Sequence, residues 1–221
     1  MMREMDFIDE CYAEKDLSLL KKLTLVIPTY NRNYYLSRCL WYHAHFPFGE
    51  IIVADSSPEE KKVVNRETIQ KIREMFGAKI RYLEYEPETE KYGGDIYRKW
   101  GDAVQHVETE YSQICTDKDF QVPTTHTKCI EHLEMYTDYT LAEGDNYLIK
   151  NNNKNNEKEY YLWQSRGSII ATEPLTRLYM VIPYNACPLL AIYRSGSQKE
   201  IYSRYISSSI PDLRFGEATI E

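Results

Sequence analysis

The sequence predicts an α/β fold built on a mostly parallel sheet, and three features carry this prediction. The first is a run of apolar and β-branched residues from Leu23 to Ile27, typical of a strand buried on both faces of a parallel sheet. The second is the alternation of strand and helix patterns through residues 23–120, which requires parallel strands joined by crossover helices. The third is that polar residues follow these strands, at the edge where open α/β sheets bind ligands.

In the first half of the chain, each expected strand is followed by an expected helix. Pro28 ends the first strand because proline has no N–H for the ladder. Pro47 and Gly49 break the next helix, and Gly77 caps the one after it. After the strand that begins at Leu23, strands are expected at 50–55, 79–86 and 111–116, helices at 33–46, 59–76 and 96–107, and a turn at 92–95. The residues of helix 59–76 expected to face inward are Val63, Val64, Ile69, Ile72 and Met75.

The second half has a more mixed pattern. A polar, Asn-rich segment at 151–159 separates two short apolar runs, which predicts a β-hairpin with a long loop. Pro123 marks a helix start. The expected elements are a helix at 123–135, a strand at 139–143, hairpin strands at 147–149 and 160–163, a helix at 174–181, a strand at 189–193 and a helix at 199–207.

Composition excludes several classes of function. The net charge is −7 and no basic cluster is present, which argues against nucleic acid as the partner. The five cysteines are scattered, so we expect reduced thiols in the core of a cytoplasmic protein. No run approaches the roughly 18 apolar residues of a membrane span. His43 and His45 lie on different sides of their helix, so this pair does not predict a metal site.

Asp117 and Asp119 follow the expected strand 111–116 and are separated by one residue. Acid-x-acid patterns also occur elsewhere in this acidic chain, so the position at a strand end is what makes this one informative. Two unit charges about 4 Å apart repel by roughly 4 kcal/mol at an effective dielectric near 20. A divalent cation between the carboxylates relieves this repulsion, and hard oxygen ligands suit Mg²⁺ or Mn²⁺. Such a cation also explains how an acidic protein can hold a diphosphate.

Three segments together resemble the nucleotide-sugar glycosyltransferases of family 2, which have the GT-A fold. They are LVIPTYNR at 25–32, IIVADS at 51–56 and TDKD at 116–119, in the order of that family. The resemblance covers residues 23–120 well and the rest loosely. It implies a Rossmann-like, mostly parallel central sheet flanked by helices. Residues 1–22 are expected to form a helical extension from their own pattern. The resemblance implies a nucleotide-sugar-binding half at 23–120 and a smaller, mixed acceptor-side half of the same domain at 121–221, in which the early C-terminus suggests truncation.

The resemblance also implies roles for the residues at the strand ends. Thr29 and Tyr30 line the base, with Tyr30 stacked on uracil or its equivalent, and Asp55 accepts a hydrogen bond from the base. Asp117 binds the ribose or helps to position the metal, and Asp119 ligates it. The residues expected to bind the nucleotide are Pro28, Thr29, Tyr30, Asn31, Arg32, Asp55, Ser56, Lys99 and Asp117, and the expected metal ligands are Asp117 and Asp119.

Two positions in this set are left open. Family members often carry a basic residue near the diphosphate on the helix before the metal motif, and either Lys99 or Arg98 takes that place here. Inverting enzymes of this type need a carboxylate base close to the attacking hydroxyl. Glu217 is the expected base because Phe215-Gly-Glu217 resembles the start of the family's acidic motif, although Ala218 replaces its usual Asp. The weaker alternatives to Glu217 are Glu173 and Asp212.

The implied activity is metal-dependent, inverting transfer of a hexosyl group from a nucleotide-diphosphate sugar, with a UDP-sugar favoured. The acceptor is a glycan or a lipid-linked glycan, in polysaccharide biosynthesis, and peripheral membrane association is left open. The alternative is an inactive nucleotide- or sugar-binding module. Lys118, between the two aspartates of the acidic motif, supports this alternative. A nucleotidyltransferase or a dinucleotide-dependent oxidoreductase would need a glycine-rich phosphate loop after the first strand, and residues 28–33 contain no glycine.

Overall fold

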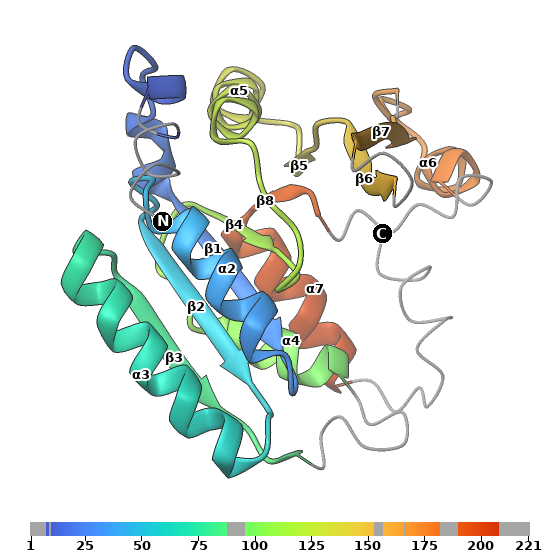
Figure 1. Cartoon of the computed structure of the whole chain (residues 1–221). Coiled ribbons are helices and arrows are strands. Elements are labelled where there is room, and N and C mark those ends of the chain that lie inside the picture. The colour runs from blue at the N-terminus through green and yellow to red at the C-terminus, as the bar shows by residue number, and fades with distance from the viewer. Residues whose placement is uncertain are drawn as a thin grey trace.

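The computed structural model describes residue 8 and residues 10–87, 96–152, 157–165, 167–181 and 190–207 (Figure 1). Its central sheet has six strands in the order β3-β2-β1-β4-β8-β5. Strands β1 to β4 run parallel to one another, whereas β8 runs antiparallel to β4 and to β5. The strands are β1 (Leu23–Thr29), β2 (Glu50–Asp55), β3 (Ile80–Glu84), β4 (Tyr111–Ile114), β5 (Leu141–Ala142) and β8 (Ile192–Arg194). The sequence prediction of a mostly parallel sheet is therefore confirmed.

The strand order places a switch point beside β1. From β1 the chain moves outward through β2 and β3, and then returns to add β4 on the other side of β1. Helices α2 (Asn33–His43), α3 (Glu59–Phe76) and α4 (Ile96–Gln105) lie between these strands in the sequence. In open α/β sheets, ligands bind outside the carboxyl ends of the strands at such a point. Thr29, Asp55 and the residues after Ile114 all lie at this edge.

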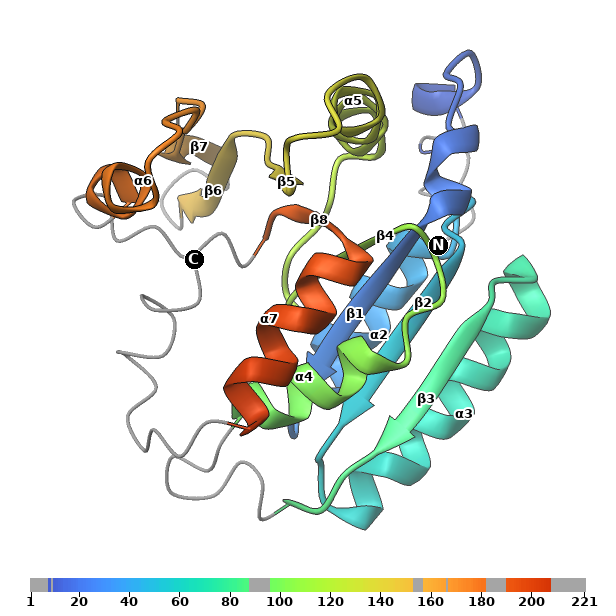
Figure 2. The same ribbon diagram turned by 180° about the vertical axis from the view of Figure 1, so that it is seen from behind.

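Two apolar clusters show that helices cover both faces of the sheet. Leu25, Ile27 and Val53 pack with side chains of α2, α3 and α5 (Pro123–Met135). Val26 and Ile52, on the opposite face, pack with α4 and with Tyr202 of α7 (Ser195–Ser207). Figures 1 and 2 show α2 and α3 on one side of the sheet and α4 and α7 on the other. This alternation follows from the period of two in a strand.

The central strand continues one residue beyond the proline that was expected to end it. Pro28 pairs with Ala54 of β2, and β1 ends at Thr29. The carbonyl of Val26, two residues before Pro28, accepts the N–H of Cys115 on the β4 side, whereas the carbonyl of Thr29 accepts the N–H of Ser56 on the β2 side. Because successive residues of a strand face opposite sides, the nitrogen of Pro28 faces the β4 side, as Val26 does. β4 has already ended there, so the absence of an N–H on Pro28 costs no hydrogen bond of the sheet.

The inward face of α3 differs from the prediction. Val63, Val64 and Met75 are exposed, and the buried residues are Lys62, Asn65, Ile69 and Ile72. Lys62 Nζ donates to the carbonyl of Tyr85 at 2.7 Å, and Asn65 donates to Asp55. Polar side chains therefore occupy positions that an apolar pattern cannot identify.

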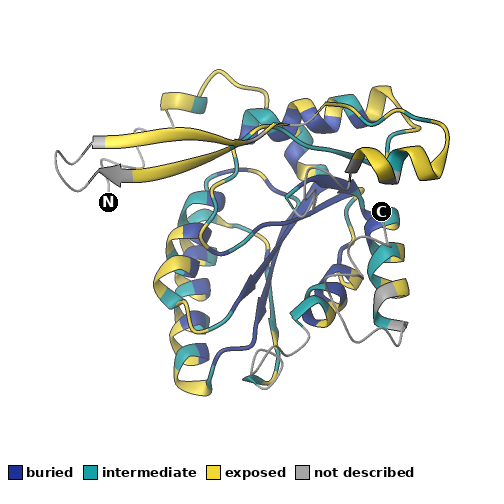
Figure 3. Cartoon of the chain, turned by 90° about the vertical axis from the view of Figure 1, so that its right-hand side faces the viewer, coloured by how far each residue is buried: buried dark blue, intermediate teal, exposed yellow. Residues whose placement is uncertain are grey.

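The second half of the chain adds smaller elements to this core. A 3₁₀ helix, η1 (Ser18–Lys22), precedes β1 and buries Leu20. Strands β6 (Asn146–Asn152) and β7 (Glu157–Gln164) form a separate antiparallel hairpin followed by α6 (Pro174–Val181). Figure 3 shows this hairpin as an exposed ribbon outside the main sheet. Within the described ranges, no helix has both the length and the apolar character needed to cross a membrane.

Candidate functional site

Asp117 links the end of the central strand to the loop after β4. Its side chain is 2% exposed. Thr29 Oγ1 donates to Asp117 Oδ2 at 2.8 Å, and Arg32 Nη1 donates to Asp117 Oδ1 at 3.1 Å. The Arg32 side chain is half exposed, so its guanidinium lies at the surface of this arrangement. Two of the three motifs of the sequence prediction are therefore in direct contact.

Lys99 links the remaining motif, IIVADS at 51–56, to the end of β1. Although it is a lysine on a helix, it is 3% exposed. Its ammonium group donates to Ser56 Oγ at 2.8 Å and to the carbonyl of Thr29 at 3.3 Å. Arg98, the alternative basic residue, is exposed. Of the two residues that the sequence left open, Lys99 is the one that contacts the ends of β1 and β2.

Asp55 is held inside the protein by its own chain. It is fully buried, and Oδ1 accepts the backbone N–H of Ser57 at 2.7 Å. Oδ2 accepts a hydrogen bond from Asn65 Nδ2 at 2.7 Å and another from the Tyr82 hydroxyl at 2.6 Å. Burial, and secondly the bond to this carboxylate, raise the pKa of Tyr82. Asp55 therefore fixes the turn after β2, and a hydrogen bond from the base N–H to its carboxylate remains a prediction.

The loop after β1 makes a sharp turn that presents Tyr30 and Arg32. Asn31 has φ of 54°, in the left-handed region that asparagine tolerates better than most residues. The backbone N–H of Asn31 donates to Ser57 Oγ at 2.8 Å, which ties this loop to the turn after β2. Pro28 and Thr29 are buried, whereas Tyr30 is partly exposed and Asn31 is exposed. Tyr30 thus follows Thr29, whose carbonyl contacts Lys99 and Ser56, and is partly exposed at this strand end.

Asp119 differs from Asp117 in how it is engaged. It is half-buried, its N–H donates to the carbonyl of Thr116 at 3.1 Å, and Oδ2 accepts Thr116 Oγ1 at 2.5 Å. In the part of the chain that the structure describes, Oδ1 accepts no hydrogen bond. A carboxylate with one available oxygen fits Mg²⁺ or Mn²⁺, which bind through one or two carboxylates and retain waters. To act as a metal ligand, Asp117 would have to give up its hydrogen bond from Thr29 or from Arg32.

The three carboxylates considered as the catalytic base are not brought to this site by the described structure. Glu217 and Asp212 lie outside the described residues. Glu173 is exposed and directly precedes α6, where its carbonyl accepts the N–H groups of Thr176 and Arg177. The identity of the base therefore stays a prediction.

Sequence reasoning missed the residues that support the site from beneath. Asn65 and Tyr82 hold Asp55, although each lies far from it in the sequence. The signal that could have indicated Asn65 is its position one helical turn before the buried Ile69 of α3. Below the loop after β4, Cys39, His43 and Cys115 form a further buried cluster.

No family of known proteins matches this sequence, and no curated protein matches it either. Among solved structures, the fold is similar to that of the mannosyltransferase PcManGT from Pyrobaculum calidifontis in complex with GDP-Man and Mn²⁺. That likeness has a TM-score of 0.53 and 14% identity, and covers 90% of this chain and 50% of that one. The fold is also similar to residues 1–349 of S. aureus TarS, with a TM-score of 0.51 and 17% identity over 89% of this chain and 54% of that one.

The chain thus spans about half the length of each of these two proteins. At such identities the likeness concerns the fold. The chain has an α/β fold of the GT-A glycosyltransferase type, as the sequence predicts.

Proposed function

We propose that the chain is the donor-binding and catalytic region of a nucleotide-sugar glycosyltransferase. The observation that carries the proposal is a single hydrogen-bonded network at the switch point of the sheet. In it, Asp117 contacts Thr29 and Arg32, and Lys99 contacts Thr29 and Ser56. The GT-A fold supports the same conclusion, because its neighbours include a mannosyltransferase with GDP-Man and Mn²⁺.

The network supplies what a nucleotide diphosphate needs for binding. Lys99 and Arg32 bring two positive charges to the strand ends of an otherwise acidic chain. Tyr30 offers an accessible ring for stacking on the base, and Pro28, Asn31 and Ser56 shape the surrounding turns. We assign the phosphates to the side of Lys99 and Arg32, because ammonium and guanidinium groups are the standard partners of phosphate oxygens.

The metal ligand in this proposal is Asp119, with Asp117 as a second ligand after rearrangement. Mg²⁺ or Mn²⁺ held there would stabilise the negative charge that develops on the departing diphosphate. The other residues of the network position the donor: Lys99 and Arg32 orient the diphosphate, and Asp117 keeps Thr29 and Arg32 in place. Since the turn 116–119 is fixed by Thr116, Asp119 can hold its position before the donor arrives.

The finer assignments follow the family 2 resemblance. We infer an inverting hexosyl transfer in the cytoplasm, from a UDP-sugar to a glycan or lipid-linked glycan of a polysaccharide pathway, with Glu217 as the base. Peripheral association of the protein with a membrane is compatible with a lipid-linked acceptor. Each of these assignments extends beyond the fold.

A thermal-shift screen with UDP-, GDP-, CMP- and dTDP-sugars, with and without Mn²⁺, tests donor binding. A donor present at about 100 times its dissociation constant should stabilise the protein by about 2.7 kcal/mol. We expect this gain to require Mn²⁺ and to be lost in Asp119→Asn, whereas Glu131→Gln, an exposed carboxylate change on α5, should retain it. Equal responses of the two variants, or no Mn²⁺-dependent shift with any donor, would refute the proposal.

The second candidate is a binding module that holds the donor without turnover. The exposed Lys118 between the two aspartates favours it, because a cation there competes with a metal ion. Release of nucleoside diphosphate from the donor separates the two functions. A transferase should leak the sugar slowly to water in the presence of Mn²⁺, whereas a module should bind the donor and leave it intact.

A further inference from the structure

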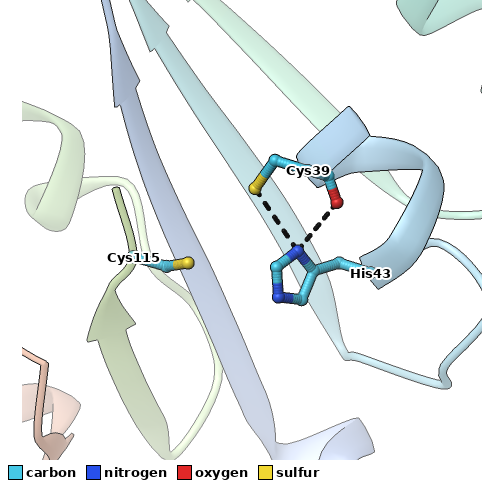
Figure 4. Close-up of side chains that lie close together, drawn as sticks. All are labelled: Cys39, His43 and Cys115. Atoms are coloured by element: carbon cyan, nitrogen blue, oxygen red, sulfur yellow. Dashed lines mark hydrogen bonds between the residues drawn. The ribbon is translucent and has the colours of Figure 1, made fainter. Parts of the chain in front are cut away.

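A buried cluster of two thiols and one imidazole lies beneath the loop that carries Asp117 and Asp119. Cys39 and His43 are one turn apart on α2, and Cys115 directly follows β4. All three side chains are fully buried. One ligand atom from each lies within 4.8 Å of the other two, and Figure 4 shows Cys39 and Cys115 facing His43. The proposed transfer reaction uses none of these groups.

We propose that Cys39, His43 and Cys115 form a structural site for a soft or borderline d¹⁰ cation, which we assign as Zn²⁺. The ligand types select the metal, because thiolate and imidazole suit Zn²⁺ whereas carboxylate and water suit Mg²⁺ and Mn²⁺. The site is thus chemically distinct from the one proposed at Asp119.

The spacing of the ligands is close to what a zinc ion requires. Zn–S bonds of about 2.3 Å and Zn–N bonds of about 2.0 Å place the ligand atoms of one tetrahedral site roughly 3.5 to 3.8 Å apart. Cys39 Sγ already lies 3.4 Å from the imidazole of His43, at Nδ1. Because one ring nitrogen and the two sulfur atoms lie within 4.8 Å of one another, closing the site requires shifts of about 1 Å and a reorientation of the ring that directs Nε2 to the sulfurs.

The hydrogen bonds of His43 leave Nε2 as the ring nitrogen that can bind a metal. Nδ1 lies 2.8 Å from the carbonyl oxygen of Cys39, which can only accept, so Nδ1 carries the proton. The lone pair is then on Nε2, where it accepts the backbone N–H of Gln121 over 3.3 Å. A ligating histidine with its other N–H on a backbone carbonyl is the usual arrangement around zinc. Binding would exchange the long Gln121 bond for a metal–nitrogen bond.

Among the described residues, the two thiols make long contacts with backbone oxygens. Cys39 Sγ lies 3.9 Å from the carbonyl of Thr116 and 3.8 Å from that of Asp119, and Cys115 Sγ lies 3.5 and 3.8 Å from the same oxygens. Little is therefore lost when they ligate a metal. The side-chain amide of Gln121 has its nitrogen 3.4 Å from Cys115 Sγ, and its oxygen accepts a hydrogen bond from Gln113 Nε2 at 3.3 Å. A flip of this amide would bring an oxygen next to the cluster as a further ligand, at the cost of the bond from Gln113.

The charge of the loaded site is compatible with its burial. Zn²⁺ replaces the protons of two thiols, two protons leave to solvent, and the imidazole stays neutral, so the ion and two thiolates sum to zero. Because Cys39 and His43 belong to α2 and Cys115 starts the loop after β4, the ion would join α2 to that loop. Zinc would thereby fix the backbone that carries Asp117 and Asp119.

Metal analysis of the full chain tests the site independently of any donor binding. After loading with Zn²⁺ under reducing conditions and desalting, we expect about one zinc ion per chain. Cys39→Ser and Cys115→Ser should each weaken zinc binding at least about tenfold. Cys129→Ser, which changes a buried thiol of α5 outside the cluster, should keep the ion, and so should Asp119→Asn. Loading with Co²⁺ should give a thiolate-to-metal charge-transfer band.

A readout on the unmodified chain covers the case in which a serine variant does not fold. Zinc should protect two of the five thiols from a thiol reagent. Wild-type protein that retains no zinc after desalting, or thiol reaction rates unchanged by zinc, would overturn the proposal. A folded Cys39→Ser variant that binds as much zinc as Cys129→Ser would overturn it as well.

Discussion

Asp55 offers a test of whether a carboxylate at a strand end faces the ligand or the protein. The change Asp55→Asn keeps the size of the side chain and removes its charge. The amide oxygen can still accept the N–H of Ser57, but the amide nitrogen then faces two donors, Asn65 Nδ2 and the Tyr82 hydroxyl. Tyr82 can rotate its hydroxyl and accept. Asn65 can offer its oxygen only by losing the bond from Asn33 Nδ2 at 2.8 Å.

The magnitude follows from these contacts. A buried donor without a partner costs about 1 to 3 kcal/mol, and each of the two remaining bonds loses about 1 kcal/mol when its acceptor becomes neutral. We therefore expect Asp55→Asn to lower the free energy of unfolding by roughly 3 to 5 kcal/mol, a large share of the 5 to 15 kcal/mol typical of a domain. Tyr82→Phe removes one bond and leaves the carboxylate charged, so about 1.5 to 3 kcal/mol should be lost.

Urea unfolding followed by circular dichroism measures both losses, and the slope with denaturant should stay unchanged while the midpoint falls. Nucleotide affinity of the folded Tyr82→Phe protein should stay close to that of the wild type. The reasoning is refuted if Asp55→Asn unfolds at the wild-type urea concentration and yet binds nucleotide poorly. That result would mean that the carboxylate turns toward the base, as the family resemblance suggests.

Three further predictions concern Lys99 at the strand ends and two residues of α2 that contact the loop after β4. Lys99→Met should weaken donor binding about tenfold to a hundredfold, because one charge-assisted hydrogen bond is worth about 1.5 to 3 kcal/mol. Titration calorimetry measures the affinity, with Arg98→Met at the exposed neighbouring position as the control. Equal donor affinities of the two variants would contradict this prediction. Tyr42→Phe removes the 2.9 Å hydrogen bond from the Tyr42 hydroxyl to the carbonyl of Gln121, which lies two residues after Asp119. Because this bond helps to hold the loop that carries Asp119, Mn²⁺-dependent donor binding should weaken severalfold while the melting temperature falls only slightly. Unchanged Mn²⁺ dependence of donor binding would contradict this prediction. Burial lowers the pKa of His43 from 6.5 to about 3 and the pKa of His126 from 6.5 to about 4, so the unfolded chain binds more protons below pH 6.5. Each of the two groups should cost metal-free protein about 2 kcal/mol of unfolding free energy between pH 7 and pH 5; His43→Gln should therefore remove about half of this slope in urea titrations, and the same slope in both proteins would contradict the assignment.

Local signals explain why much of the fold could be predicted. Helix α3 was predicted at 59–76 and α5 at 123–135, because Gly77 and Pro123 mark the boundaries and apolar residues repeat with a helical period. The strand after Gly49 was likewise predicted at 50–55. Within α3, however, the face was partly wrong, since Val63 and Val64 are exposed while Lys62 and Asn65 are buried. Their partners lie on β2 and after β3, and contacts across that distance leave no local pattern.

In the candidate site, too, some features could be predicted from the sequence and others could not. The three motifs could be placed at one sheet edge because parallel strands end on the same side, and Thr29 does contact Asp117. The support beneath the edge could not be predicted, since Cys39 and Cys115 are 76 residues apart and neither has a cysteine close to it in the sequence. The histidine that was examined for metal binding, His43, was paired with His45 for reasons of spacing. In the structure its neighbours are the two thiols.

The charges at the strand ends make a metal-bound donor the consistent interpretation. Asp55 and Asp117 direct their negative charge to donors of the chain itself, including Arg32. Lys99 is turned inward onto Ser56 and Thr29, so much of its charge is also shared with the protein. Asp119 is left half-buried with one oxygen that accepts nothing from the described residues. An approaching diphosphate would therefore meet a carboxylate. A divalent ion on Asp119 reverses this local charge, and for that reason we expect the donor to bind as its metal complex.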